Sequence, residues 1–315
     1  MSFSVVIPLY NKALHIERAL KSVFKQTCQD FEIIVVNDGS TDNGREIVED
    51  IHDSRIRLIN QSNEGVSVAR NNGVEAANNK FVAFLDADDE WLPDFLENII
   101  VLRNNFPECG AYATSSYIIR PDGKIDYPLL VGLPPEPWIG IIPNFFGLFQ
   151  TGYAFNATST VVPKKILLDV GGFPAGVKLS EDVACWINIA IRYPIVYNPK
   201  RLVIYHQEAF NRSNMYKNLN EEPYIKIIRD AINNGLIPKE LQEEALEFIA
   251  QRQIFSATAN VMEGNPAYAR QLLATCTQTR KYKKMWLWWR LWATFPEGWP
   301  LRIMKIKQLL QKRLN

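Results

Sequence analysis

The first hundred residues alternate between short apolar runs and longer mixed stretches. Residues 4–8 and 31–37 read as strands, and the stretch 14–26 between them reads as a helix. A crossover of this length joins parallel strands into a βαβ unit. Further strands are expected over 55–60 and 81–85, with an Ala-rich helix between them. The pattern therefore predicts an α/β fold with a mixed, mostly parallel sheet and flanking helices.

Three carboxylates, Asp86, Asp88 and Asp89, directly follow the strand 81–85 and form what we call the acidic cluster. Crowded carboxylates repel one another and are costly to desolvate, so a cation is expected among them. Asp86 and Asp88 are two residues apart and can face one ligand together. Hard oxygen ligands suit Mg²⁺ or Mn²⁺, with diphosphate oxygens and water completing the shell. The alternative is an acidic turn in which Asp89 caps the helix that starts near Pro93.

A second polar position, Asp38, follows the strand 31–37 and precedes a Gly-Ser turn. Ligands of open parallel sheets collect at the carboxyl ends of strands, so Asp38 and the loop after Pro8 are expected to flank one crevice. There Asp38 suits hydrogen bonding to a base or a ribose. The alternative is a cap or Asx-turn for a helix beginning near Asp42. The sequence contains neither G-x-G-x-x-G after these strands nor G-x-x-x-x-G-K-[ST], so neither a dinucleotide fold nor a P-loop is supported.

Five motifs follow one another along residues 3–215. They read VVIPLYN, VVNDGSTD, NEGVSVARNNG, FLDADDEWLPD and GGFPAGVKLSEDVACW. This series resembles the inverting glycosyltransferases of family 2. The resemblance implies a GT-A fold, a nucleotide-sugar donor that is usually a UDP-sugar, and a divalent cation, Mn²⁺ or Mg²⁺.

The resemblance also implies roles for residues on the donor side. Asp38 would contact the uracil, Asp86 the ribose and Asp88 the metal. Arg70, within the matching ARN, would lie near the base or the diphosphate, unless it is a surface or salt-bridged Arg. His206 lies where related enzymes have residues near the diphosphate and is a candidate third metal ligand, with a surface His as the alternative. The residues that would shape the base pocket are Pro8 and Tyr10.

On the acceptor side, the resemblance implies that Asp182 is the catalytic base and that Glu181 orients the acceptor. Apolar residues recur at helical spacing after Ser180, so both acids stand at a helix start. Sugar transfer needs a carboxylate within reach of the acceptor hydroxyl. Phe173 and Trp186 would exclude water there and raise the pKa of the base. The alternative is that the acids complement the helix dipole and Ser180 caps the helix.

The region 120–150 is rich in Pro and aromatic residues, and its six prolines argue against regular structure. A loop of this length is usually functional, so we expect it in the acceptor site, with Trp138 stacking on a sugar. A structural excursion packed on the core is the alternative.

The C-terminal third differs in character. Residues 221–280 have helical spacing, and residues 280–315 hold five of the eight tryptophans beside ten Lys or Arg and a single Glu. Interleaved Trp, Leu and basic residues favour a helix at a membrane interface over nucleic-acid binding. The alternative is packing on the catalytic domain or on a twin subunit. We predict a GT-A catalytic domain over 1–220, with its nucleotide half about 1–110 and its acceptor half about 111–220, followed by a helical region over 221–315.

Composition bears on the kinds of metal or disulfide site and on the cellular location expected of the chain. The 315 residues carry a net charge of +1, and the four Cys are far apart without C-x-x-C spacing, so neither a zinc site nor a disulfide framework is indicated. No signal peptide and no membrane-spanning window are expected. The predicted location is the cytoplasm, with peripheral attachment to the inner surface of the cytoplasmic membrane.

These observations predict a metal-dependent inverting transferase in cell-surface polysaccharide biosynthesis. It would move a hexose or N-acetylhexosamine to a hydroxyl of a glycan or lipid-linked acceptor. Two alternatives stay open: a nucleotide-sugar-binding protein without activity, and a membrane-peripheral scaffold. No nucleic-acid partner is expected, and self-association into a homodimer is left open.

Overall fold

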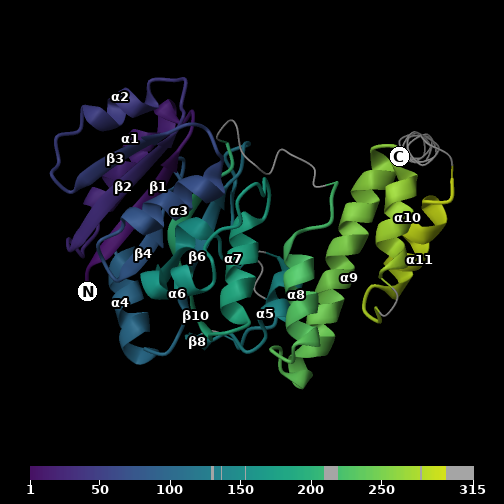
Figure 1. The fold of residues 1–315 in the computed structure, drawn as a ribbon. Coiled ribbons are helices and arrows are strands. Elements are labelled where there is room, and N and C mark those ends of the chain that lie inside the picture. The colour runs from purple at the N-terminus through teal and green to yellow at the C-terminus, as the bar shows by residue number, and fades with distance from the viewer. Residues whose placement is uncertain (129–130, 136, 153, 209–218, 277–278, 296–315) are drawn as a thin grey trace. The chain divides into compact units, whose positions relative to one another are not determined.

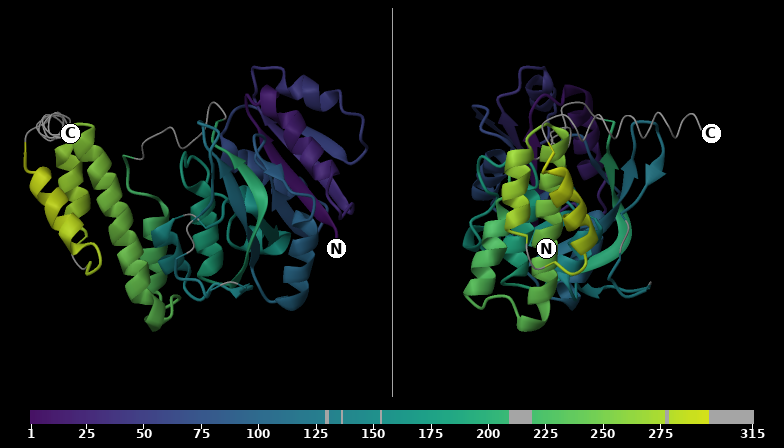
Figure 2. Two further views of the ribbon diagram at one scale, coloured as in Figure 1. Left: turned by 180° about the vertical axis from the view of Figure 1, so that it is seen from behind. Right: turned by 90° about the vertical axis from the view of Figure 1, so that its right-hand side faces the viewer.

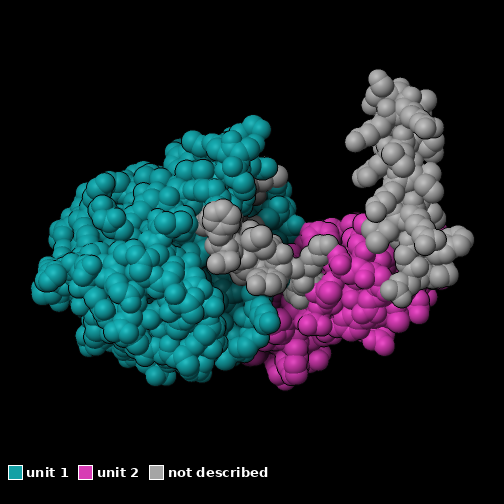
Figure 3. Space-filling view, turned by 90° about the horizontal axis from the view of Figure 1, so that it is seen from above, with its two compact units in different colours: residues 1–213 teal, residues 214–315 magenta. Residues whose placement is uncertain are grey.

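The computed structural model describes residues 1–128, 131–135, 137–152, 154–208, 219–276 and 279–295. The chain divides into two compact units, residues 1–213 and 214–315 (Figure 3). Within the described ranges, every strand lies in the first unit and the second unit is helical (Figure 1). The sequence placed the corresponding boundary at residue 220.

The first unit alternates strands and helices as the apolar pattern predicts (Figure 1). Its strands are β1 (Phe3–Leu9), β2 (Phe31–Asp38), β3 (Ile56–Gln61), β4 (Phe81–Phe84), β5 (Glu90–Trp91), β6 (Ala111–Ile119), β7 (Ile125–Asp126), β8 (Gly140–Ile141), β9 (Thr160–Pro163) and β10 (Ile195–His206). Its helices are α1 (Ala13–Phe24), α2 (Gly44–Glu49), α3 (Val66–Ala76), α4 (Phe95–Asn105), α5 (Phe145–Thr151), the 3₁₀ turn η1 (Ala157–Ser159), α6 (Lys164–Asp169) and α7 (Glu181–Ala190).

The strands of the described chain form one sheet in the order β3-β2-β1-β4-β9-β6-β10-β5, with β7 beside β6 and β8 beside β10. The first four strands are parallel, with Leu9 opposite Asn37 and Val6 opposite Phe84. β9 is antiparallel to both of its neighbours, β4 and β6. The predicted mixed, mostly parallel sheet is thereby confirmed, and the ends of β1, β2 and β4 open at one edge.

Helices cover both faces of this sheet (Figures 1 and 2). On one face, alternate residues of β1 such as Val5 and Ile7 pack with apolar residues of α1 and α4. On the other face, Gly73 of α3 lies so close to β1 that a Cβ would stand 2.3 Å from a methyl of Val6. A side chain there would force α3 away from the sheet and would displace the residues that this helix carries.

The prediction that residues 120–150 lack regular structure is wrong in part. β7 pairs with β6, β8 pairs with β10, and α5 follows. Phe145 and Phe149 of α5 stack at 4.4 Å, and Phe155 packs edge-on against both. The prolines limit the length of each element in this segment. The phenylalanines nevertheless form a buried cluster, and burial of their side chains stabilises α5 as a short helix. Trp138 lies before β8 and is half-buried.

In its described residues, the second unit contains α8 (Tyr224–Asn233), α9 (Lys239–Met262), α10 (Pro266–Ala274) and α11 (Lys283–Trp292). Its core gathers apolar residues of α9 and α10, and Met285, Trp286, Trp289 and Trp292 of α11 pack against them. The buried carboxylate of Glu247 fixes the start of α11 by accepting hydrogen bonds from Thr279 Oγ1 and from the Arg280 and Lys281 amides. None of the described helices combines the length and apolar character needed to cross a membrane.

Candidate active site

The loops after β1 and β2 are joined to each other at the open edge of the sheet. The Asn11 side-chain oxygen accepts a hydrogen bond from the Thr41 amide at 2.8 Å, and the Asn11 amide donates to Ser40 Oγ at 3.2 Å. Asn11 has a φ of 52°, a conformation that Asn tolerates better than most residues. The tip of the first loop is therefore held in one place beside the second. Pro8 is partly buried in β1, and Tyr10 beyond it is 43% exposed.

Asp38 is buried at the end of β2, where three donors surround its carboxylate. It accepts from Gln61 Nε2 and from the Glu64 and Gly65 amides, at distances of 2.8 to 2.9 Å. The alternative in which Asp38 caps a helix near residue 42 is wrong, because these donors belong to the end of β3 and the loop before α3, and the N-cap residue of α2 is Asn43. Asp38 thus fixes that loop at the crevice. Its contact with a base stays a prediction.

Two members of the acidic cluster face cations, as the sequence predicts. Asp86 Oδ1 accepts from Arg70 Nη2 at 2.7 Å, and Asp88 Oδ2 lies 2.8 Å from Lys12 Nζ. Asp89 is buried and accepts from Thr158 Oγ1 and the His206 amide. Burial and the neighbouring carboxylates raise the pKa of Asp89 well above its usual value. Asp89 therefore ties β10 to η1 and does not cap α4, whose N-cap residue is Asp94.

Arg70 connects the acidic cluster to α7. Its side chain is 4% exposed, and its second guanidinium nitrogen, Nη1, donates to Glu181 Oε1 at 2.7 Å. The guanidinium also lies 5.2 Å from the centre of the Phe173 ring. The two carboxylates raise the pKa of Arg70, so it is cationic at every accessible pH. Arg70 is thus a buried salt-bridged residue in this structure, and its predicted approach to base or diphosphate stays a prediction.

Asp182 stands in the first turn of α7, beside Glu181. Its oxygen Oδ1 accepts from the Val183 amide at 2.7 Å, and the residue as a whole is half-buried. Dense surroundings and the charge of Glu181 raise the pKa of Asp182 to about 7, although Arg70 acts in the opposite direction. Ser180 is left-handed, with a φ of 60°, and its side chain does not cap the helix, so the capping part of the alternative is wrong. Both acids do stand in the first turn of α7, where they complement the helix dipole.

An aromatic wall lies under the start of α7. The rings of Phe173 and Trp186 meet edge to face at 5.7 Å, and the ring of Phe84 at the end of β4 contacts both. All three side chains are buried. Phe173 and Trp186 thus form a pair, as the sequence predicts, and their effect on the pKa of Asp182 stays a prediction.

His206 ends β10 and is held between two carboxylates. Its Nδ1 lies 2.6 Å from Glu208 Oε1, and its Nε2 lies 2.7 Å from Glu90 Oε1. Each ring nitrogen thus has a carboxylate partner in this arrangement, and neither is free to approach a metal. The role of His206 as a metal ligand stays a prediction that needs this arrangement to open.

The carboxylates that remain for a divalent cation are Asp86 and Asp88. Both are partly accessible, with side chains 26% and 13% exposed, and both offer hard oxygen ligands. No group of three or more His, Cys, Asp or Glu side chains in the described ranges is arranged to hold a metal. The residues therefore fit an ion of the Mg²⁺ type, which takes one or two carboxylates from the protein and the other ligands from phosphate and water.

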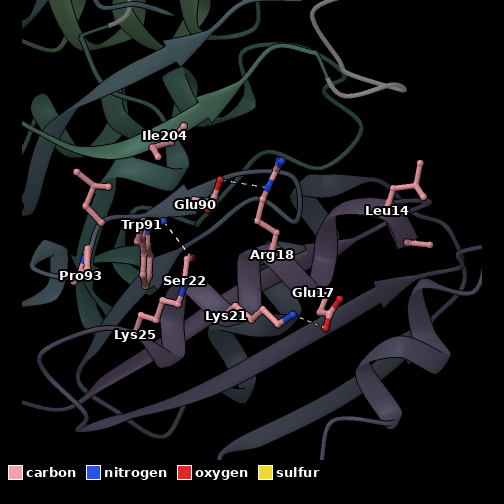
Figure 4. Close-up of a pocket in the computed structure, with 12 residues that line it drawn as sticks. Leu14, Glu17, Arg18, Lys21, Ser22, Lys25, Glu90, Trp91, Pro93 and Ile204 are labelled. Carbon is pink, nitrogen blue, oxygen red and sulfur yellow. Dashed lines mark hydrogen bonds and ion pairs between the residues drawn. The ribbon is translucent and has the colours of Figure 1, made fainter. Parts of the chain in front are cut away.

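Two cationic residues of this site were missed in the sequence. They are Lys12 and Arg18 of α1. Arg18 donates a hydrogen bond to the Asp88 carbonyl oxygen, and its Nε lies 3.4 Å from Glu90 Oε1. The signal for Lys12 was present, because crowded carboxylates require a cation and Lys12 follows the loop of the first strand. Arg18 also lines a hollow of about 410 Å³ between α1 and β5 (Figure 4). None of the predicted site residues lines that hollow.

Comparison with known proteins identifies the family of the N-terminal region and the fold. Residues 4–128 match the family model described as glycosyl transferase family 2. The chain carries a glycosyltransferase family 2 domain. An uncharacterized glycosyltransferase of Rickettsia bellii is 31% identical over 240 residues, which are 75% of this chain and 33% of that protein. The uncharacterized glycosyltransferase YibD of Escherichia coli is 46% identical over 123 residues, 38% of this chain and 36% of that protein. The chain thus spans about a third of the length of these relatives.

Solved structures confirm the GT-A fold. The crystal structure of S. aureus TarS 1–349 in complex with UDP-GlcNAc superimposes with a TM-score of 0.64. The match covers 92% of this chain and 79% of that one at 18% identity. A second structure of TarS 1–349, in complex with UDP, superimposes with a TM-score of 0.56 over 86% of this chain.

Proposed function

We propose that this protein is a metal-dependent inverting glycosyltransferase that moves a sugar from a nucleotide-sugar, a UDP-sugar, to a hydroxyl group. The observation that carries the proposal is the position of Asp182. Dense surroundings raise the pKa of its carboxyl group to about 7, and it follows Glu181, which Arg70 connects to Asp86 at the end of β4. A proton acceptor suited to neutral pH thus stands beside the crevice in which sheets of this type bind their ligands.

The donor would bind across the ends of β1, β2 and β4. Tyr10 is exposed at the first of these ends, Asp38 is fixed at the second, and Asp86 follows the third. A base between Pro8 and Asp38 and a ribose near Asp86 would leave the diphosphate toward Asp88. The complex of TarS with UDP-GlcNAc supports a nucleotide-sugar as the donor class.

Asp88, with Asp86 beside it, would hold the divalent cation together with oxygens of the donor diphosphate. When bound, Mg²⁺ or Mn²⁺ would act as a Lewis acid that stabilises charge on the departing diphosphate. Without the cation, the protein itself supplies a positive partner to each of these carboxylates: Lys12 pairs with Asp88, and Arg70 pairs with Asp86.

The transfer itself requires one proton acceptor from the chain. As the acceptor oxygen forms its bond to the anomeric carbon, the bond from that carbon to the diphosphate oxygen breaks, and Asp182 takes the hydroxyl proton. Attack opposite the leaving group inverts the anomeric configuration in one displacement. A base with a pKa of about 7 is ionised in half of the molecules at pH 7 and has the driving force that proton transfer needs.

The acceptor class and the cellular setting follow from the sequence together with the C-terminal helix. We propose a glycan or lipid-linked acceptor in cell-surface polysaccharide biosynthesis, met at the inner surface of the cytoplasmic membrane. In support, α11 exposes Leu287, Trp288 and Leu291 beside basic residues, although its other Trp side chains pack inward. Residues 296–315, the rest of the predicted membrane tail, lie outside the described residues.

The test is nucleotide release from a panel of donors: UDP-glucose, UDP-galactose, their N-acetyl forms and GDP-mannose. Asp182→Asn should keep UDP binding and reduce transfer or hydrolysis by about 100-fold or more. Asp169→Asn, an exposed acid that bonds only Tyr193 in the described chain, is the matched control and should behave as the unmodified protein. UDP binding without turnover of any donor would favour a binding protein, and the absence of UDP binding would favour a scaffold.

A further inference from the structure

We propose that Lys12 is an internal counter-ion of Asp88 that competes with the divalent cation and transfers its charge to the donor diphosphate, so that metal and donor bind as a pair. This inference rests on the proposed function, because it concerns the same donor site. It assigns a role to Lys12, and it adds a coupling between metal binding and donor binding to the proposed function.

The ion pair of Lys12 and Asp88 is built into the site. Lys12 occupies the N-cap position of α1, and its Nζ reaches Asp88 Oδ2 at 2.8 Å across 76 residues of sequence. The two side chains are only 11% and 13% exposed, unlike a surface pair. Asn11, the preceding residue, is hydrogen-bonded to the loop after β2, which keeps the base of the Lys12 side chain in place.

The two carboxylates of the acidic cluster that are proposed as metal ligands already face protein cations. Asp88 pairs with Lys12, and Asp86 pairs with Arg70, which it shares with Glu181. Asp89 is buried and accepts hydrogen bonds from the Thr158 hydroxyl and the His206 amide. Toward β10, the carboxylates of Glu90 and Glu208 face Arg18 and the His206 ring. A divalent cation that arrives alone therefore has to compete with Lys12 for Asp88.

The balance changes when metal and donor arrive together. A divalent cation at Asp88 has to displace the Lys12 ammonium from Oδ2, because two cations at ion-pair distance from one oxygen repel. A UDP-sugar brings two negative charges on its diphosphate, which offer the displaced ammonium a new partner. Lysine suits this exchange because its point charge sits on a flexible stem. Binding of the metal frees Lys12 for the diphosphate, and the diphosphate draws Lys12 away from Asp88. Each ligand should therefore raise the affinity of the site for the other by the same factor.

The experiment measures Mn²⁺ binding by electron paramagnetic resonance and UDP binding by calorimetry, each with and without the other ligand. For the unmodified protein, saturating UDP should tighten Mn²⁺ binding by about tenfold or more, within the usual range of such coupling. Lys12→Met should bind Mn²⁺ alone more tightly, bind UDP more weakly and lose most of the coupling. Lys12→Arg should retain the coupling. Lys200→Met, which removes an ion pair with Asp94 outside the acidic cluster, is the matched control and should change nothing.

Two outcomes separate this inference from the proposed function. If Lys12→Met binds Mn²⁺ and UDP with the affinities and coupling of the unmodified protein, the inference on Lys12 is overturned while the glycosyltransferase proposal stands. If the unmodified protein binds no UDP at any Mn²⁺ concentration, the proposed function fails. The Mn²⁺ measurement without nucleotide still tests Lys12 in that case. A gain in Mn²⁺ affinity in Lys12→Met that Asp88→Asn abolishes supports the inference, and a gain that survives Asp88→Asn overturns it.

Discussion

Replacing Arg70 by Gln tests whether the donor and acceptor sides of the site are electrostatically connected. The guanidinium makes two charge-assisted hydrogen bonds of 2.7 Å, to Asp86 and to Glu181, and is almost fully buried. Removing one partner of a buried ion pair costs about 3–5 kcal/mol, because the carboxylates left behind lose their counter-charge. For a unit of this size, a loss of about 3 kcal/mol lowers the melting temperature by about 6–12 °C.

The same substitution should change the pH dependence of turnover. The groups that face Asp182 are Glu181 on its own helix, Arg70 on α3 and Asp86 after β4. Glu181 and Asp86 raise the pKa of Asp182, and Arg70 is the charged group that lowers it, so Arg70→Gln should move this pKa above about 7. An increase of one unit reduces the ionised fraction of the base at pH 7 from about a half to about a tenth. The acidic limb of the kcat/KM profile should therefore move to higher pH.

The assay is nucleotide release from pH 5.5 to 9.5, with thermal unfolding followed in parallel. Arg70→Lys is the informative control, because it keeps the positive charge but loses the planar two-sided geometry. It should lose stability while retaining the acidic limb of the unmodified protein. An Arg70→Gln variant with an unchanged limb and an unchanged melting temperature would refute the reasoning, because neither the charge nor the connection would then matter.

Two further predictions concern Asp89 and α11. Asp89→Asn should lower the melting temperature less than Asp89→Ala does, because the raised pKa of Asp89 favours the neutral form that Asn resembles and the Thr158 hydroxyl can rotate to accept from the amide. Asp89→Ala should cost about 1–3 kcal/mol, since it leaves buried donors unpaired. A joint change of Leu287, Trp288 and Leu291 to Glu should abolish co-sedimentation with anionic vesicles. The control is Leu168→Glu in α6, where an equally exposed Leu is replaced and co-sedimentation should persist. Equal sedimentation of both variants would exclude α11 as the membrane contact.

The elements that position the donor side were predictable because they are local in sequence. β1, β2 and β4 are continuous apolar runs, α1 between the first two is long enough for a parallel crossover, and the carboxylates stand where β4 ends. Helical spacing after Ser180 likewise located α7. Each of these signals depends on fewer than about 15 neighbouring residues, the range in which periodicity carries information.

The partners within the site could not be predicted in the same way. Arg70 and Glu181 are 111 residues apart, and no local pattern states which of many carboxylates a buried Arg will meet. The engagement of His206 by Glu90 and Glu208 depends on β5 lying beside β10, an antiparallel pairing between segments far apart in the chain. The prediction for the region 120–150 was wrong in part for a different reason. Proline content indicates where helices and strands end, but it does not indicate whether Phe145 and Phe149 pack in a buried helix between those ends.

The ion pairs of the site leave Asp182 without a counter-charge of its own. Arg70 holds Asp86 and Glu181, and Lys12 holds Asp88, whereas Asp182 forms no ion pair within the described residues. A paired carboxylate is stabilised in its ionised form, while an unpaired one in dense surroundings has a raised affinity for protons. The pairing pattern thus favours Asp182 over Glu181, its neighbour in sequence, as the proposed base. Through Arg70, Glu181 connects the first turn of α7 to the end of β4, and its contact with the acceptor stays a prediction.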